Sequence, residues 1–316
     1  MKEFFIARKF GAEALVLLEK IAAILERYAA EGYDLSLRQL YYQLVAANVV
    51  PNSERSYKNI GNLVSDARLA GLIDWDMISD RGRTTIANSH WNNPQEIVEA
   101  CAAGFRIDKW ATQPSHVEVM VEKQALEGVL VPVCRELDIA FSANKGYSSS
   151  SALYEAGKRL KRALDDDKEV HLIYLGDHDP SGIDMTRDVG VRLNLFANVI
   201  GEVEVGDPNF DLKEKLDAGV QGIRVHRIAL NMPQIEELNP PENPAKLTDS
   251  RATAYIQRFG ESSWELDAIE PKALARLVRN KVFEIRDADL WDEAVKKEKA
   301  MRDELLRFAN EKKGRK

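Results

Sequence analysis

The sequence predicts an α/β protein with a helical N-terminal domain, a parallel-sheet domain and a helical C-terminal extension. Apolar residues recur at helical spacing up to about residue 70, and helical patterns return after residue 251. Between them, apolar runs of strand length alternate with helical patterns from residue 117 to residue 230. Strands that alternate with helices form parallel sheets covered on both faces. We place the domains at residues 1–110, 111–235 and 236–316.

The N-terminal domain has the element order of a winged helix. Helical patterns cover residues 12–30, a second segment that Ser36 can cap, and residues 53–70, where Gly71 ends the third helix. The stretch LIDWDMISDRGRTTI then alternates apolar and polar residues around a turn at Asp80–Gly82, as a hairpin does.

In a winged helix, the third helix is placed for the DNA major groove, and basic side chains contact phosphates. The candidates for such contacts are Arg55, Lys58, Arg68, Arg81 and Arg83. A structural or protein-binding cap made of the same elements is the alternative.

The second domain should contain four strands, at residues 117–121, 139–143, 170–175 and 223–230. Helices are expected between them at 126–137, 151–164 and 183–196. This order indicates a Rossmann-like parallel sheet. A linker over residues 88–114 joins it to the first domain, and the C-terminal extension should hold helices at 251–259, 271–284 and 289–310.

Composition indicates a soluble, cytoplasmic protein. No apolar run reaches the roughly 18 residues that a membrane-spanning helix needs, and the N-terminus lacks a secretory signal pattern. Cys101 and Cys134 are far apart, which predicts two buried free thiols rather than a disulfide or a zinc site. The net charge of −7 does not favour a nucleic-acid partner, but net charge is a weak guide where charge is unevenly placed.

Three acidic residues fall at the carboxyl ends of predicted strands, where parallel α/β sheets bind ligands. Glu122 follows the first strand, and Asp177 and Asp179 follow the third. Residues two apart on a strand point to the same side, so Asp177 and Asp179 can project together while His178 points away. Clustered carboxylates repel unless a cation lies between them, and oxygen ligands suit Mg²⁺. We therefore predict a Mg²⁺ site at Glu122, Asp177 and Asp179.

The motifs around these acids resemble those of the Toprim fold. Val121-Glu122-Lys123 matches the VEK motif at the first acid, residues 177–182 (DHDPSG) match DxDPxG at the second pair, and Lys145-Gly146-Tyr147 matches the glycine turn. Together with the preceding winged helix, they resemble the A subunit of topoisomerase VI and its meiotic break-forming relatives. The likeness covers roughly residues 35–230. It implies DNA cleavage by a protein whose Toprim acids bind Mg²⁺.

The same family carries an Arg-x-x-Tyr-Tyr run whose second tyrosine is the nucleophile. Arg38-Gln39-Leu40-Tyr41-Tyr42 resembles this run, which implies that Tyr42 attacks the phosphodiester and forms a phosphotyrosyl link. A phenol with a pKa near 10 needs a neighbouring cation at pH 7. Arg38 lies four residues earlier on the same helix face and can stabilise the phenolate or the phosphate. The alternatives are that Tyr41 is the nucleophile, or that both tyrosines are packed in the core.

The resemblance also implies a homodimer, because the family sets the tyrosine of one protomer against the metal site of the other. No P-loop occurs, so ATP-driven strand passage would need a separate ATPase subunit. The chain departs from the family after the glycine turn, where an arginine is usual. Here serines occupy residues 148–151 and the next arginine is Arg159. The serines should cap the next helix, with phosphate binding as the alternative.

The leading hypothesis is a Mg²⁺-dependent DNA transesterase. A metal-dependent nuclease that uses activated water, with Tyr42 merely packed, is the first alternative. A DNA-binding subunit whose acids are vestigial is the second.

Overall fold

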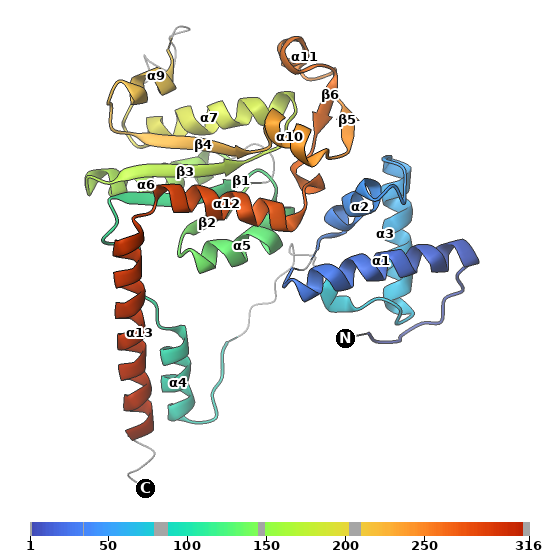
Figure 1. Cartoon of the computed structure of the whole chain (residues 1–316), viewed down its shortest axis with the longest axis horizontal. Coiled ribbons are helices and arrows are strands. Elements are labelled where there is room, and N and C mark those ends of the chain that lie inside the picture. Colours follow the sequence, from blue (N-terminus) through green and yellow to red (C-terminus); the bar gives the residue numbers. More distant parts are fainter. Residues whose placement is uncertain (1, 34, 79–87, 145–148, 202–209, 312–316) are drawn as a thin grey trace.

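The protein consists of a helical N-terminal domain, an α/β domain, and a pair of helices that extends away from the α/β domain (Figure 1). The computed structural model describes residues 2–33, 35–78, 88–144, 149–201 and 210–311. Within these residues, a four-stranded parallel sheet forms the centre of the α/β domain. The predicted α/β class is confirmed.

The N-terminal domain packs three helices around one core: α1 (Ala12–Ala30), α2 (Leu37–Ala46) and α3 (Glu54–Leu69). Their bounds agree with the predicted helices to within a few residues. Helix α2 begins at a capping box, in which Ser36 Oγ accepts from the Gln39 amide and Gln39 Oε1 accepts from the Ser36 amide. Gly71 has a φ of 72°, which ends α3 as expected.

The described part of the predicted hairpin contains no strand. Residues 72–78 hold a 3₁₀ turn, Trp75–Met77, and a single bridge that pairs Ile78 with Leu35. The alternating pattern has another cause, because Ile73 and Ile78 anchor this segment to the helical core. The predicted turn at Asp80–Gly82 lies outside the described residues.

The sheet has the strand order β2-β1-β3-β4, and all its strands are parallel. The strands are β1 (Ser115–Val121), β2 (Ala140–Ala143), β3 (Glu169–Leu175) and β4 (Ile223–Ala229). The connections contain α5 (Glu127–Glu136), α6 (Ser150–Asp165), α7 (Pro180–Phe196) and the short helix α9 (Leu212–Asp217). Val121 pairs with Leu175, so the carboxyl ends of β1 and β3 lie side by side.

Alternate residues of the central strands pack on opposite faces of the sheet. Val119 of β1 and Ile173 of β3 belong to the core under α5 and α12, whereas Met120 and Leu172 belong to the core under α6 and α7. Buried residues on both faces explain why these strands read as continuous apolar runs in the sequence.

The C-terminal segment is part of the α/β domain. It comprises α10 (Met232–Leu238), the two-stranded sheet of β5 (Glu242–Pro244) and β6 (Ser262–Trp264), α11 (Ala252–Phe259), a 3₁₀ turn (Leu266–Ala268), α12 (Pro271–Ile285) and α13 (Ala288–Glu311). Helix α12 lies beside α5 on one sheet face and shares its core (Figure 1). Residues 236–316 therefore do not form a core of their own.

The predicted linker contains a helix, which the sequence pattern did not indicate. Helix α4 (Pro94–Gly104) packs along α13, and the two project together from the α/β domain (Figure 1). Just after α4, Lys109 Nζ lies 2.7 Å from a carboxylate oxygen of Glu298 on α13. Cys101 on α4 is exposed, so the prediction of a buried thiol is wrong there and correct only for Cys134. None of the described helices is both long enough and apolar enough to cross a membrane.

Candidate active site

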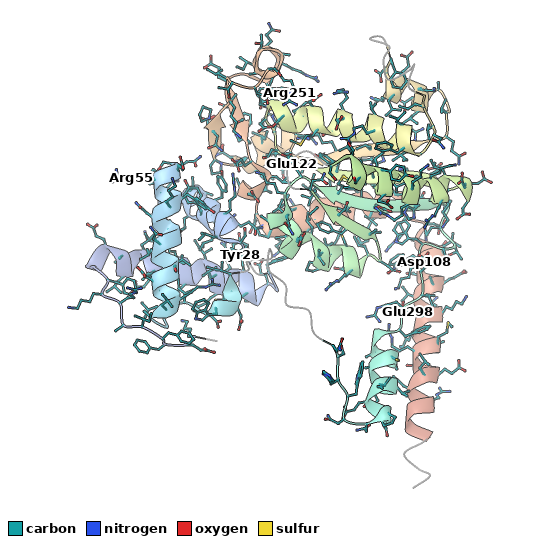
Figure 2. The ribbon with its side chains drawn as sticks, turned by 180° about the vertical axis from the view of Figure 1, so that it is seen from behind. Tyr28, Arg55, Asp108, Glu122, Arg251 and Glu298 are labelled. Carbon is teal, nitrogen blue, oxygen red and sulfur yellow. The ribbon has the colours of Figure 1, made fainter. Side chains whose placement is uncertain are left out.

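Two of the predicted metal ligands meet at the carboxyl ends of the central strands. The Glu122 amide donates to the Leu175 carbonyl at 2.9 Å, which continues the pairing of β1 with β3 by one residue. Glu122 Oε2 accepts from the Asp177 amide at 2.8 Å. Both side chains are buried. Figure 2 shows Glu122 at the centre of the molecule, where the sheet faces the N-terminal domain.

Gly176 and Gly182 are needed for space and not for an unusual φ. A Cβ on Gly176 would lie 2.8 Å from Glu122 Oε2 and 2.9 Å from the Tyr174 ring. A Cβ on Gly182 would lie 2.3 Å from the Asp177 carbonyl oxygen. Neither glycine has a positive φ. These two glycines therefore allow the backbone to pass close to the Glu122 carboxylate and to the Asp177 carbonyl.

The Asp177 carboxylate is held by Lys123 and by the C-terminal segment. Lys123 Nζ lies 2.7 Å from Asp177 Oδ2, and the Leu266 amide donates to Asp177 Oδ1 at 2.8 Å. The same ammonium lies 2.9 Å from Glu265 Oε2 and 3.3 Å from Asp267 Oδ2. Three carboxylates thus share one lysine.

Arg38 joins this network from the N-terminal domain. Its guanidinium pairs with Glu265, and its Nε lies 3.2 Å from Asp267 Oδ2. The two carboxylates raise the pKa of Arg38 although burial acts in the opposite direction. Glu265 and Asp267 therefore connect a cation on α2 to a cation at the end of β1. We call Arg38, Lys123, Glu265 and Asp267 the charged network.

Asp179 and His178 have structural partners. Asp179 Oδ1 caps α7 by accepting from the Gly182 amide at 2.6 Å, and it accepts from Ser181 Oγ at 2.9 Å. His178 contacts the C-terminal segment. Its Nδ1 lies 2.8 Å from the Tyr255 hydroxyl, and its ring packs against Phe259 and Trp264.

Burial and crowding of negative charge raise the pKa of Glu122 to about 7. Burial is the largest cause, and the neighbouring Asp177 and Asp179 carboxylates add to it. The pKa of Asp177 is also raised by burial, although Lys123 opposes this shift. A cation placed among these acids would favour their ionised forms.

The donor chemistry suits Mg²⁺, but the acids do not converge in the present arrangement. Carboxylate oxygens from Glu122, Asp177 and Asp179 are the ligands that Mg²⁺ takes. The Tyr174 hydroxyl is buried against this site, and no hydrogen-bond partner for it occurs among the described residues. No three acidic, histidine or cysteine side chains in the described part of the chain are grouped closely enough to hold a metal ion. Metal binding would require these carboxylates to move closer together and Asp177 Oδ2 to exchange Lys123 for the ion.

Tyr42 lies beside the charged network and Tyr41 does not. Arg38 Cζ stands 5.9 Å from the centre of the Tyr42 ring. Burial and the negative charge of Glu265 raise the pKa of Tyr42 to about 12, whereas Arg38, Lys123 and Asn243 lower it. The expectation that Arg38 favours the phenolate is correct in direction, but burial outweighs it. The residue as a whole is only 4% exposed, so Tyr42 is buried.

The Tyr41 hydroxyl holds the connection between α2 and α3. It accepts from the Ser53 amide at 2.7 Å and lies 3.2 Å from Asn52 Oδ1. Asn52 in turn donates to Asn243 Oδ1 of β5 at 2.8 Å. These bonds give Tyr41 a structural role and leave Tyr42 as the tyrosine next to the cations.

The predicted DNA-contacting residues have different surroundings. Arg55 is exposed on α3 (Figure 2), and Lys58 is exposed but pairs with Glu54 at 2.7 Å. Arg68 Nη2 donates to the carbonyls of Trp75 and Ile78, both at 2.6 Å, so it fixes the segment after α3. Arg81 and Arg83 lie outside the described residues, as does the predicted turn at Lys145-Gly146-Tyr147. DNA contact by all five basic residues stays a prediction.

The serine run caps a helix, as expected. Ser149 Oγ accepts from the Ala152 amide at 3.1 Å and starts α6, while Ser150 Oγ accepts from Arg192. Arg159, the first arginine after the run, forms two hydrogen bonds of 2.8 and 2.7 Å to the buried carboxylate of Glu118. This arginine fixes α6 to β1.

Sequence reasoning missed Lys123, Glu265 and Asp267 as site residues. Lys123 follows Glu122 directly, and the Glu265-Leu266-Asp267 spacing repeats that of Asp177 and Asp179. Two acids with one residue between them were therefore a usable signal. Nothing in the sequence placed the segment near α2, because that contact depends on the path of β5, β6 and the 3₁₀ turn.

Neither the models of known protein families nor the curated protein sequences match this chain.

Proposed function

We propose that the protein is a DNA-cleaving transesterase that uses Tyr42 as its nucleophile and requires Mg²⁺. One observation carries this proposal: a single chain sets Tyr42, Arg38 and Lys123 together beside the acidic strand ends at Glu122 and Asp177. A tyrosine, two fixed cations and clustered carboxylates are the groups that phosphodiester transesterification uses.

In the proposed reaction the Tyr42 hydroxyl attacks a backbone phosphorus. A bond forms between the tyrosine oxygen and phosphorus, and the bond from phosphorus to a sugar oxygen breaks. The phenol loses a proton, and the departing sugar oxygen takes one up from solvent. With a pKa of about 12, Tyr42 is protonated at neutral pH, so the proton must leave as the attack proceeds. The Arg38 and Lys123 cations would stabilise the charge on the phosphate.

The Mg²⁺ ion would be held by Glu122, Asp177 and Asp179, and it would neutralise phosphate charge and orient the oxygens. The chain's own contribution is to keep Tyr42 ordered and away from water. Tyr41 supports this by fixing the turn that follows α2.

DNA and a second copy of the chain are the partners we propose. The resemblance implies that a tyrosine faces the metal site of the other protomer, whereas here Tyr42 lies beside the network of its own chain. One chain would then cut one strand, and a homodimer would cut both. A separate ATPase subunit would be needed only for strand passage.

The burial of Tyr42 favours one competing function, a Mg²⁺-dependent nuclease that uses water. The two are separated by incubating the protein with labelled supercoiled DNA and Mg²⁺ or Mn²⁺, and then denaturing it. A transesterase leaves label attached to the protein. Cleavage with all the label free would support the nuclease, and no cleavage would exclude both enzymes.

A further inference from the structure

We propose that Arg38 and Lys123 form a binding site for one phosphate group, that Asp267 holds these cations in position, and that Glu265 occupies the site until a phosphate displaces it. The inference rests on the proposed function for the identity of the substrate, a nucleic-acid strand. It assigns Lys123, Glu265 and Asp267 roles that the resemblance does not supply.

The two cations come from different parts of the fold and converge on the same two carboxylates. Arg38 lies on α2, and Lys123 follows β1. Both contact Glu265 Oε2, and both contact Asp267 Oδ2, at 3.2 and 3.3 Å. Their charged groups are therefore close enough together to share one anionic oxygen. An Arg–Lys pair in this arrangement suits a phosphate.

Asp267 and Glu265 differ in burial, which assigns them different roles. The Asp267 side chain is 0% exposed, and neither of its oxygens has a hydrogen-bond partner among the described residues beyond the two ion pairs. A buried charge is costly to keep unless it is paired, so the two cations must stay near Asp267. Asp267 is thus a positioning residue that fixes the separation of Arg38 and Lys123.

Glu265 lies on the accessible side of the same cations. Its side chain is 23% exposed, and that of Arg38 is 44% exposed. Arg38 also lines a hollow of about 520 Å³ between α2, α3 and Ala125, which gives a route of approach. An incoming phosphate can replace the Glu265 carboxylate, which exchanges one anion for another, while Asp267 stays in place. A phosphate that takes the place of Glu265 at Arg38 would lie next to the ring of Tyr42.

The test compares Glu265→Gln with Glu136→Gln in the full chain without divalent ions. Glu136 is a matched control, because it forms an arginine pair with Arg279 at 2.6 Å between α5 and α12 and has no contact with the charged network. Binding is measured by calorimetry, first with inorganic pyrophosphate and then with a short DNA duplex. Glu265→Gln should bind both anions about tenfold more tightly than wild type, since it removes a competing charged contact. Glu136→Gln should bind like wild type.

Two further variants keep the test decisive. Glu265→Ala should give the same gain as Glu265→Gln, and adding Arg38→Ala to Glu265→Gln should abolish the gain. If Glu265→Gln and Glu265→Ala bind pyrophosphate no more tightly than wild type, the proposal is overturned. A gain with pyrophosphate but no binding of DNA would keep the phosphate site and reject DNA as the substrate.

Discussion

Replacing Lys123 with methionine removes the ammonium that Asp177, Glu265 and Asp267 share. Methionine keeps much of the apolar stem, so the main loss is charge. Glu265 and Asp267 retain Arg38, but the buried Asp177 carboxylate forms an ion pair with no other cation among the described residues. Breaking a buried ion pair by removing one partner costs about 3–5 kcal/mol. Lys123 is 19% exposed, so we expect a loss of about 3 kcal/mol in the free energy of unfolding.

The assay is urea unfolding followed by tryptophan fluorescence, with Lys161→Met as the control. Lys161 pairs with Asp165 at 2.6 Å on the surface of α6, and removing such a pair should cost under about 1 kcal/mol. The difference between Lys123→Met and wild type should also grow as the pH rises. Burial already raises the pKa of Asp177, and loss of Lys123, which opposes this shift, raises it further in the folded variant. The folded variant therefore binds the Asp177 proton more tightly than the unfolded chain does, and it loses stability as rising pH removes that proton.

Mg²⁺ should recover part of this loss. Without Lys123, Asp177 Oδ2 is free to bind an ion, and a ligand at about 100 times its Kd stabilises by about 2.7 kcal/mol. A Lys123→Met protein as stable as the Lys161→Met control, at every pH from 5 to 8, would refute the view that Lys123 holds the site together.

Three more predictions concern single residues. The raised pKa of Glu122, about 7, means that its protonated form stabilises the fold below pH 4.5 and that this contribution is lost as the pH rises towards 7. In Glu122→Gln, the free energy of unfolding should therefore fall less between pH 4.5 and pH 7 than in wild type, as measured by urea unfolding in a metal-free buffer. Asp179→Ala should lower the free energy of unfolding by about 1 kcal/mol through loss of the α7 cap, whereas Asp179→Asn keeps the cap. Both variants should lose Mg²⁺-dependent cleavage, and cleavage by either would exclude Asp179 as a ligand. Arg55→Ala should lower the slope of log K against log salt for duplex DNA by about 0.9 if this residue contacts a phosphate, and an unchanged slope would place it outside the interface.

Much of the fold follows from local pattern. Helix α1 begins and ends where its apolar spacing indicated. The alternating apolar patterns also predicted the order of strands and helices along the chain in the α/β domain. Glu122 and Asp177 could be placed near each other because parallel strands end at the same edge. Their proximity needed no knowledge of loops.

The sequence could not show what depends on long-range packing. The sequence of helix α4 resembles that of a linker, because its eleven residues bury only Ala102 and leave a weak apolar stripe. Glu265 and Asp267 reach Arg38 only because β5 pairs with β6 and the chain turns back beside α2. The pKa of Tyr42 likewise depends on burial, which the spacing from Arg38 does not reveal.

The central claim is that the Tyr42 oxygen attacks DNA, and one comparison of covalent products tests it most directly. Wild type, Tyr42→Phe and Tyr41→Phe are each incubated with end-labelled DNA and Mg²⁺, denatured, and assayed for label that migrates with protein. Tyr42→Phe keeps the ring and should bind DNA and Mg²⁺ normally, yet give no cleavage and no covalent product. Tyr41→Phe should retain both. A Tyr42→Phe protein that still cleaves DNA at the wild-type rate would contradict the transesterase and leave the Mg²⁺-dependent nuclease.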